Sequence, residues 1–304
     1  MKNKPSFLDT IRIGTLVNAL APDPANYIAQ ILPHGFESFQ LSFWETAMKV
    51  NLKDLARRVN DTLSDCPATI SSLAIFGNPL ETAPKDKETL ASWKRLIDHA
   101  HLFGTDIIAG FSGRVRGKSI ADSMPRFKKV FGELARRAED RGVRLCFENC
   151  HMNGNWATGD WNLAHGPDAW ELMFDAVPFK NVGLEWEPCH QMVSLIDPLP
   201  QLRKWVGKIF HVHGKDANLR WDVIREHGIH GPKSYVSHRT PGFGDTNWTH
   251  VISELRQGGF RGAIDIEGWH DPVYVKELEM TGQVHALNYL KQCRGGSFVV
   301  NPKE

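Results

Sequence analysis

The chain has 304 residues, 41% of them hydrophobic, so it is long enough to bury a full core as one domain. Its 36 Lys and Arg residues nearly balance its 35 Asp and Glu residues, which leaves no overall field that would attract nucleic acid or an anionic membrane. The five cysteines are an odd set without CxxC spacing, which argues against a disulfide framework and against a structural zinc site.

The N-terminal segment gives no sign of export. MKNKPSFLDTIRIG has no apolar stretch before Asp9, and no later stretch approaches the roughly eighteen apolar residues of a membrane-spanning helix. We therefore expect a cytoplasmic protein with reduced thiols and no membrane segment, whose partner is a small molecule and not a nucleic acid.

Apolar runs typical of strands alternate with helical patterns along the chain. The predicted strands are 11–17, 35–43, 70–76, 106–111, 143–148, 182–187, 209–213 and 263–267. Apolar residues spaced by three and four predict amphipathic helices at 90–100, 127–138 and 248–255. Asp245 or Thr246 is placed to cap the last of these helices, and Gly104 and Gly142 lie where the helices before them should end.

This alternation fits either a closed barrel or a doubly wound open sheet. No glycine-rich phosphate-binding motif follows the first strand, which favours an α/β fold of the (β/α)8 TIM-barrel type, with residues 1–304 as a single domain. The connections 151–167 and 214–244 exceed the roughly 2–6 residues usual for βα loops. Both follow the carboxyl ends of strands, where barrel active sites are built, so we expect them to act as lids.

Potential metal ligands stand at the ends of the last predicted strands. These residues are Glu148 in LCFENCH, Glu187 in GLEWEPCH, His213 in FHVHGKD and Glu267 in AIDIEGWHD. Carboxylates buried repeatedly at one end of a barrel are costly unless a shared cation neutralises them. Three carboxylates and one imidazole suit one divalent ion, with Mn²⁺ as first choice and Mg²⁺ or Co²⁺ as alternatives.

Polar residues also occur two positions before three of these ligands. Glu185, His211 and Asp265 share a strand face with Glu187, His213 and Glu267, because side chains alternate with a period of two. We expect them either to form a hydrogen-bonded layer that orients the ligands above, or to pair only among themselves.

The motifs ENCH, WEPCH, HVHGKD and DIEGWHD resemble those of the xylose isomerase-like TIM-barrel superfamily, which contains sugar phosphate isomerases and epimerases. The resemblance covers nearly the whole chain and is strongest from Val143 to Asp271. It implies that Glu148, Glu187, His213 and Glu267 bind one metal ion. The family usually has Asp in a DPxH motif on the sixth strand, where this chain has EPCH, so Glu185 and Glu187 both remain candidates for that ligand. Dimers or tetramers are common among such barrels, which makes a homo-oligomer an open expectation.

Further residues are expected to contact the substrate. The resemblance assigns His190 of EPCH to substrate hydroxyls. Lys215 could steer an oxyanion or be a simple loop charge, and Arg239 in HRTPGFGD could bind a substrate oxygen or lie on the surface. Trp186, together with other tryptophans near the expected mouth, could supply an apolar wall for a sugar ring.

The expected reaction is proton transfer next to a carbonyl group. With Glu148 and Glu267 as the catalytic acid/base pair and a cation that stabilises an enediolate, the site would isomerise or epimerise a sugar or a small hydroxy-ketone. The same site could instead act as a lyase or dehydratase on a keto sugar. The sequence does not distinguish these outcomes.

Two other classes of function fit less well. An apurinic-site endonuclease would resemble the three-zinc barrels that carry extra histidines after early strands, but here the third strand runs into AIFGNPL without one, and the net charge is only +1. A non-catalytic sugar-binding barrel would need neither a metal nor paired glutamates.

Overall fold

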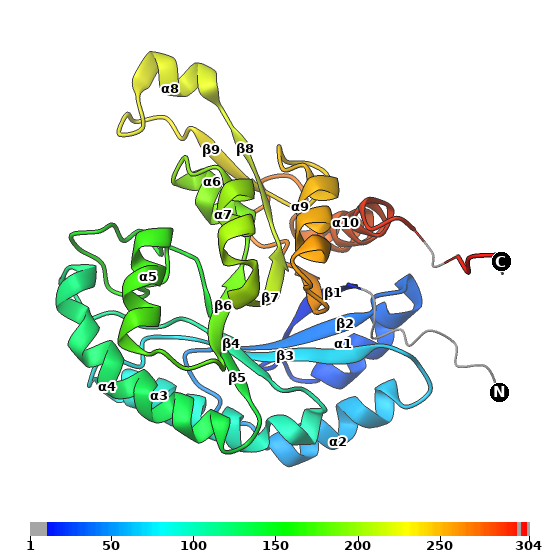
Figure 1. The fold of residues 1–304 in the computed structure, drawn as a ribbon. Coiled ribbons are helices and arrows are strands. Elements are labelled where there is room, and N and C mark those ends of the chain that lie inside the picture. Colours follow the sequence, from blue (N-terminus) through cyan, green and yellow to red (C-terminus); the bar gives the residue numbers. More distant parts are fainter. Residues whose placement is uncertain (1–10, 297–298, 303–304) are drawn as a thin grey trace.

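A closed barrel of parallel strands forms the centre of the protein (Figure 1). The computed structural model describes residues 11–296 and 299–302. The barrel strands are β1 (Arg12–Asn18), β2 (Ser38–Trp44), β3 (Thr69–Phe76), β4 (Ile107–Gly110), β5 (Arg144–Glu148), β6 (Val182–Trp186), β7 (Ile209–Gly214) and β10 (Ala263–Ile266). They close in the order β1-β10-β7-β6-β5-β4-β3-β2, so the predicted (β/α)8 barrel is confirmed.

Helices surround the barrel and bury its outer face. They are α1 (Pro24–Ile31), α2 (Leu52–Leu63), α3 (Pro84–His99), α4 (Ile120–Glu139), α5 (Pro167–Ala176), α6 (Pro188–Val193), α7 (Pro198–Trp205), α9 (Trp248–Gln257) and α10 (Glu279–Cys293). Short 3₁₀ helices follow or precede some of them at Leu32–His34, Ala100–Phe103, Val206–Lys208 and Lys276–Leu278. Because the strands are covered on both faces, they are buried almost throughout, as is usual for parallel sheets.

Helix ends follow the expected chemistry with one correction. Gly104 and Gly142 adopt the left-handed conformation, with φ of 68° and 66°, where their helical segments end. The cap of α9 is Asn247, whose Oδ1 accepts a hydrogen bond from the His250 N–H at 3.1 Å. The predicted caps Asp245 and Thr246 are therefore wrong, because the Asp245 carboxylate instead accepts from the Leu219 N–H at 2.8 Å.

The two long connections differ in structure. The connection 151–167 passes from β5 to α5 without a helix or a named strand of its own. The connection 214–244 contains the antiparallel pair β8 (Asp216–Leu219) and β9 (Val236–Arg239), joined through α8 (Trp221–His227). In Figure 1 this segment rises from the barrel as an arm at the top of the view.

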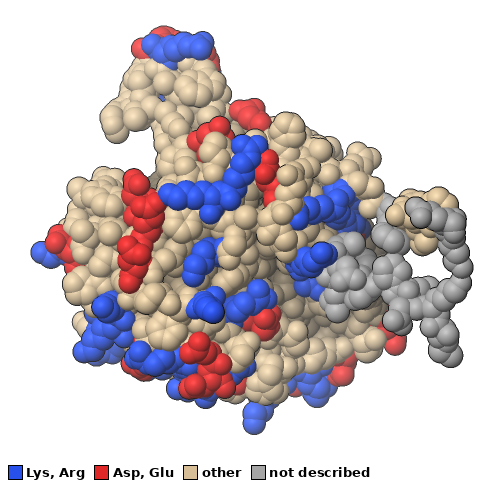
Figure 2. All heavy atoms as spheres, in the orientation of Figure 1, with Lys and Arg blue, Asp and Glu red and all other residues tan. Residues whose placement is uncertain are grey.

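The surface carries both signs of charge. On the face shown in Figure 2, basic and acidic side chains are interspersed, in keeping with the net charge of +1. Across residues 11–296 and 299–302, no helix combines the length and the apolar character needed to cross a bilayer.

Gly14 on β1 tests how closely the strands approach inside the barrel. A Cβ at this position would lie 2.0 Å from the Ser38 carbonyl oxygen and 2.2 Å from Asp265 Oδ1. We expect Gly14→Ala to lower the free energy of unfolding by at least about 1–3 kcal/mol, the usual cost of overpacking a core, as measured by urea denaturation. Gly132→Ala on α4 is the control, because a Cβ there meets no atom within 4 Å and alanine favours a helix. Equal midpoints for Gly14→Ala and the wild type would contradict this packing.

Candidate metal and active site

The carboxyl ends of β5, β6, β7 and β10 bring four potential ligands together. Glu148 ends β5, Glu187 directly follows β6, His213 lies on β7 and Glu267 directly follows β10. Each offers one ligand atom, and these four atoms lie within 4.8 Å of one another. All four side chains are buried. The four residues of the predicted ligand set thus lie together in space.

The two glutamates of β6 occupy different levels of the barrel. Glu185 lies in the barrel interior, where its Oε1 accepts from Gln40 Nε2 at 2.5 Å and lies 2.9 Å from His211 Nδ1. Glu187 belongs to the cluster with Glu148 and Glu267. Two hydrogen bonds with Asn149 fix its backbone: the Glu187 N–H donates to Asn149 Oδ1 at 2.7 Å, and Asn149 Nδ2 donates to the Glu187 carbonyl at 2.9 Å. Geometry therefore favours Glu187 over Glu185 at the cluster.

His213 is oriented from below by a residue that the sequence analysis did not consider. Its Nε2 lies 2.8 Å from Gln40 Oε1, within reach of an Nε2–H donated to that oxygen, and Nδ1 is the nitrogen that faces the carboxylates. Nδ1 lies 3.2 Å from Glu267 Oε2 and 3.8 Å from Glu148 Oε1. The imidazole thus presents Nδ1 to the carboxylates, as a metal-ligating histidine with a hydrogen-bonded second nitrogen does.

Several buried polar atoms of the cluster lack hydrogen bonds. Glu187 Oε2, Glu267 Oε2 and His213 Nδ1 have no hydrogen-bond partner among the described residues, and Glu187 Oε1 lies 3.0 Å from His190 Nε2. Burial, with the neighbouring carboxylates adding to it, raises the pKa of Glu148 and of Glu187 to about 7. A divalent cation would satisfy these atoms and offset the repulsion, and three carboxylates with one imidazole are donors that Mn²⁺, Mg²⁺ or Co²⁺ accepts. The residues present therefore fit such an ion.

A buried polar layer lies next to the cluster. His211 bridges two carboxylates, with Nδ1 2.9 Å from Glu185 Oε1 and Nε2 2.7 Å from Asp265 Oδ2. Asp265 also accepts hydrogen bonds from Ser38 Oγ at 2.5 Å and from Ser71 Oγ. Because Glu185 Oε1 lies 3.2 Å from His213 Nε2, this layer reaches the cluster instead of pairing only within itself.

A cavity of about 480 Å³ opens above the cluster and contains two of the predicted substrate contacts. His190 and Lys215 both line it. Lys215 Nζ donates to Glu267 Oε1 at 2.7 Å and lies 3.5 Å from His190 Nε2. His190 Nε2 also lies 3.0 Å from Glu187 Oε1. Both residues are therefore placed between the cluster and any molecule in the cavity.

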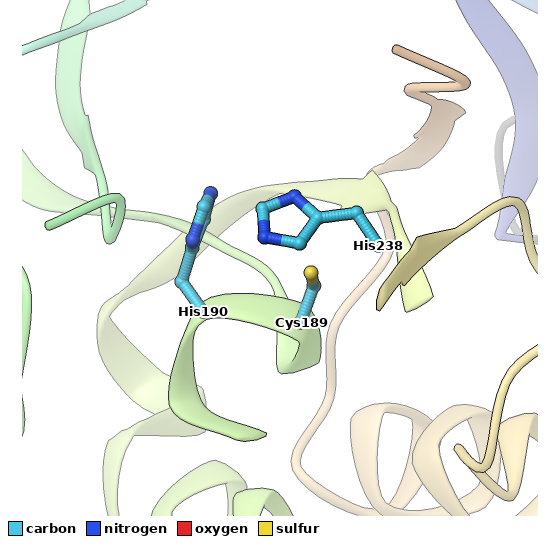
Figure 3. A group of neighbouring side chains, drawn as sticks. All are labelled: Cys189, His190 and His238. Atoms are coloured by element: carbon cyan, nitrogen blue, oxygen red, sulfur yellow. The ribbon is translucent and has the colours of Figure 1, made fainter. Parts of the chain in front are cut away.

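Further histidines, which the sequence analysis did not single out, surround His190. The ring centroid of His190 lies 5.7 Å from that of His151 and 5.4 Å from that of His238, which is 5.8 Å from that of His270. Figure 3 shows His238 and Cys189 beside His190. Burial lowers the pKa of His151 to about 4 and that of His190 and His238 to about 3, so these imidazoles are neutral near pH 7. Neutral imidazoles both donate and accept, which suits hydroxyl groups.

The remaining two predicted substrate contacts lie elsewhere. Trp186 is fully buried outside the barrel interior and donates from Nε1 to Gln191 Oε1 at 2.9 Å. Since Glu185 faces the interior, the alternation along a strand turns Trp186 toward the helices. Arg239 on β9 is bound to Asp271 Oδ2 at 3.2 Å and to Asn218 Oδ1 at 2.9 Å, away from the cavity lining. Trp186 and Arg239 thus lie outside the cavity lining, whereas His238 beside Arg239 lines the cavity.

Comparisons with known proteins agree with the fold. The sequence pattern of the family described as xylose isomerase-like TIM barrel matches residues 28–293. The rhizopine catabolism protein MocC of Rhizobium meliloti is 28% identical over 184 residues, covering 59% of this chain and 49% of the relative. An inosose dehydratase of Lactiplantibacillus plantarum is 30% identical over 165 residues, covering 53% of this chain and 50% of the relative. The matched region thus spans about half the length of these two relatives.

A solved structure supports the same fold at low sequence identity. The apo form of the 3-keto-D-glucoside 4-epimerase YcjR from E. coli superposes with a TM-score of 0.69 at 13% identity, over 93% of this chain and all of that one. At this identity the likeness concerns the fold alone. Because the family pattern covers most of the barrel, the chain belongs to the xylose isomerase-like TIM-barrel family, whose members include sugar phosphate isomerases and epimerases.

Proposed function

We propose that the protein is a metal-dependent isomerase or epimerase that moves a proton next to the carbonyl group of a sugar or small hydroxy-ketone. The observation that supports this most is the pair of buried glutamates, Glu148 and Glu267, which line one cavity and both approach His213 Nδ1. Two carboxylates in one site allow one to remove a proton and the other to return it.

The residues of the cluster and of the cavity lining have different roles in this proposal. Glu148, Glu187, His213 and Glu267 would hold the ion, with Mn²⁺ as first choice. When bound, a divalent ion would polarise the carbonyl group and stabilise the charge of an enediolate. Lys215 holds the Glu267 carboxylate through its hydrogen bond of 2.7 Å. His190 and the neighbouring imidazoles would bind hydroxyl groups and orient the ring.

The outcome depends on where the proton returns. If one glutamate removes the proton from carbon and the other delivers a proton to the opposite face of that carbon, the product is the epimer. Delivery to the neighbouring carbon, after the proton on the hydroxyl oxygen has moved, gives the aldose–ketose isomer. Epimerisation needs a carboxylate on each face of one carbon, whereas isomerisation can use one carboxylate for both steps. The distances of Glu148 and Glu267 from His213 Nδ1 allow both to reach the same small part of the cavity.

A dehydratase is the second candidate, because several relatives at 25–30% identity are named inosose dehydratase. In that reaction one glutamate removes the proton next to the keto group, a carbon–carbon double bond forms, and the adjacent carbon–oxygen bond breaks. The second glutamate then protonates the departing hydroxyl group, which leaves as water. A product lighter than its substrate by one water molecule would favour the dehydratase over the epimerase.

Metal binding is the first test. We expect the purified protein to carry close to one divalent ion per chain and to lose thermal stability when EDTA removes it. A ligand bound only by the folded state adds about 2.7 kcal/mol at 100 times its Kd. Elemental analysis and calorimetry with added Mn²⁺ measure both quantities.

Matched variants make the metal test specific. Glu187→Ala should weaken the gain in stability from Mn²⁺, whereas Glu171→Ala, at an exposed position on α5, should not. A protein that holds no metal and gains no stability from Mn²⁺ would refute the proposed site.

Replacement of each catalytic glutamate tests the proton transfer. Gln keeps the shape and one oxygen of Glu148 or Glu267 but removes the base, so each variant should lower turnover by at least about 10²–10⁴-fold with metal partly retained. For an epimerase assayed in D₂O, NMR should show deuterium entering unreacted substrate in one variant only, since loss of the acid alone leaves abstraction intact. Near-normal turnover in both variants with metal bound would rule out the enediolate mechanism.

A further inference from the structure

One side of the cavity is lined by ionisable residues from Glu148 onward, and another by aromatic residues from earlier in the chain. The ends of β5, β7 and β10 contribute Glu148, His213 and Glu267. The ends of β2, β3 and β4 contribute large aromatic rings: Trp44 ends β2, Phe76 ends β3, and Phe111 directly follows β4. We call Trp44, Phe76 and Phe111 the aromatic wall.

The aromatic wall is a packed unit beside the proposed metal cluster. The Phe76 and Phe111 ring centroids lie 5.1 Å apart, and those of Trp44 and Phe111 lie 6.4 Å apart, both edge to face. The Phe76 ring centroid is 6.4 Å from that of His213, so the aromatic wall is adjacent to the cluster. Trp44 has a relative exposure of 45%, which leaves part of its ring open to the cavity.

The wall offers few polar partners to a sugar. Its rings carry one hydrogen-bonding group, the indole N–H of Trp44, and Leu16 and Met152 add apolar surface to the same cavity. Hydroxyl groups pressed against such a surface would lose their hydrogen bonds to water without replacement, which is costly. The part of a ligand that faces the wall is therefore expected to be apolar, and edge-to-face and stacked contacts favour a flat ring.

The cavity lining offers little to bind an anionic ligand group. Among the residues that line it in the described part of the chain, Lys215 is the one Lys or Arg side chain, and its ammonium group already binds Glu267 at 2.7 Å. Phosphate and carboxylate groups are bound by arginine forks, free lysines or clustered backbone N–H groups. In the part of the chain that the structure describes, the lining therefore offers no free Lys or Arg side chain to such a group, and its two glutamates are assigned to the proposed ion.

We infer that the aromatic wall is a second subsite, which binds a flat apolar substituent carried by an uncharged sugar or cyclitol ring. The inference rests on the proposed function, which puts the sugar or cyclitol ring at Glu148 and Glu267. A substituent on that ring then lies against the aromatic wall. It names the substrate class as a neutral glycoside-like molecule and not a sugar phosphate.

Equilibrium binding tests the subsite independently of catalysis. Calorimetry with the Mn²⁺-supplemented protein would compare phenyl and methyl β-glycosides of glucose, galactose and xylose, with glucose 6-phosphate as the anionic probe. We expect at least one phenyl glycoside to bind about 10–100-fold more tightly than its methyl partner, the gain that burial of an aromatic ring provides. Glucose 6-phosphate should bind more weakly than any neutral probe that binds.

Trp44→Ala should reduce the phenyl-to-methyl ratio of affinities at least about threefold, and Trp44→Phe should restore most of it. Trp221→Ala is the matched control, because Trp221 has a similar exposure of 50% but lies on α8 outside this cavity. Its ratio should equal that of the wild type.

The outcomes separate the subsite from the proposed reaction. Equal affinity for phenyl and methyl probes, no binding by any phenyl glycoside, or preference for glucose 6-phosphate would each overturn the subsite. Proton exchange into small sugars together with no phenyl preference would leave the proposed reaction standing and the subsite refuted. A phenyl preference without metal binding or proton exchange would support the subsite and refute the proposed reaction.

Discussion

The imidazole of His211, held between the carboxylates of Glu185 and Asp265, is the interaction on which the site depends. All three side chains are fully buried, so water cannot satisfy them. Burial alone raises the pKa of Glu185, but the two histidines beside it reverse this and lower it to about 2. Removing one member of such a group leaves a buried charge unpaired, which costs several kcal/mol, about 3–5 in typical cases. The group therefore holds β6, β7 and β10 in one register.

Hydrogen bonds connect this buried group to the cluster above it. Gln40 donates to Glu185 and lies at hydrogen-bond distance from His213 Nε2, so the interior layer and the proposed ligand share one residue. The backbone of Glu187 is fixed separately by Asn149. These two hydrogen bonds with Asn149 fix the backbone from which the Glu187 carboxylate extends into the cluster.

The sequence was enough to predict the barrel and the cluster of potential ligands, because both follow from the strand and helix periods and from the position of a residue at the end of its strand. Strand ends bearing Glu148, His213 and Glu267 must meet at one rim, because parallel strands in a barrel share their carboxyl ends. The polar residues of β2 and β3, such as Gln40, Ser38 and Ser71, carried a usable signal, since polar side chains inside otherwise apolar strands need partners. That signal was weak because each residue taken alone also fits a solvated edge.

Two residues expected at the substrate, Trp186 and Arg239, lie outside the cavity lining for different reasons. The outward direction of Trp186 follows from strand alternation, because Glu185 and Glu187 on either side of it both lie on the opposite face. The expectation of a substrate contact at Trp186 did not apply this rule. The direction of Arg239 depends on the β8–β9 pairing, where Asn218 on β8 accepts from its guanidinium group. Local sequence does not determine such pairing across the α8 segment, and so it could not show that His238, and not its neighbour, faces the cavity.

The barrel also explains why chemistry and selectivity can be carried by different parts of one chain. Every strand end contributes to the same rim, and closure sets the aromatic ends of β2 and β3 in the same cavity as the ionisable ends of β5, β7 and β10. The His211 layer joins β6, β7 and β10, and Gln40, Ser38 and Ser71 link it to β2 and β3. Side chains of the aromatic wall can therefore change in size without removing a charge partner from the layer. A barrel built in this way can keep the residues of the proposed proton transfer fixed while the aromatic wall varies.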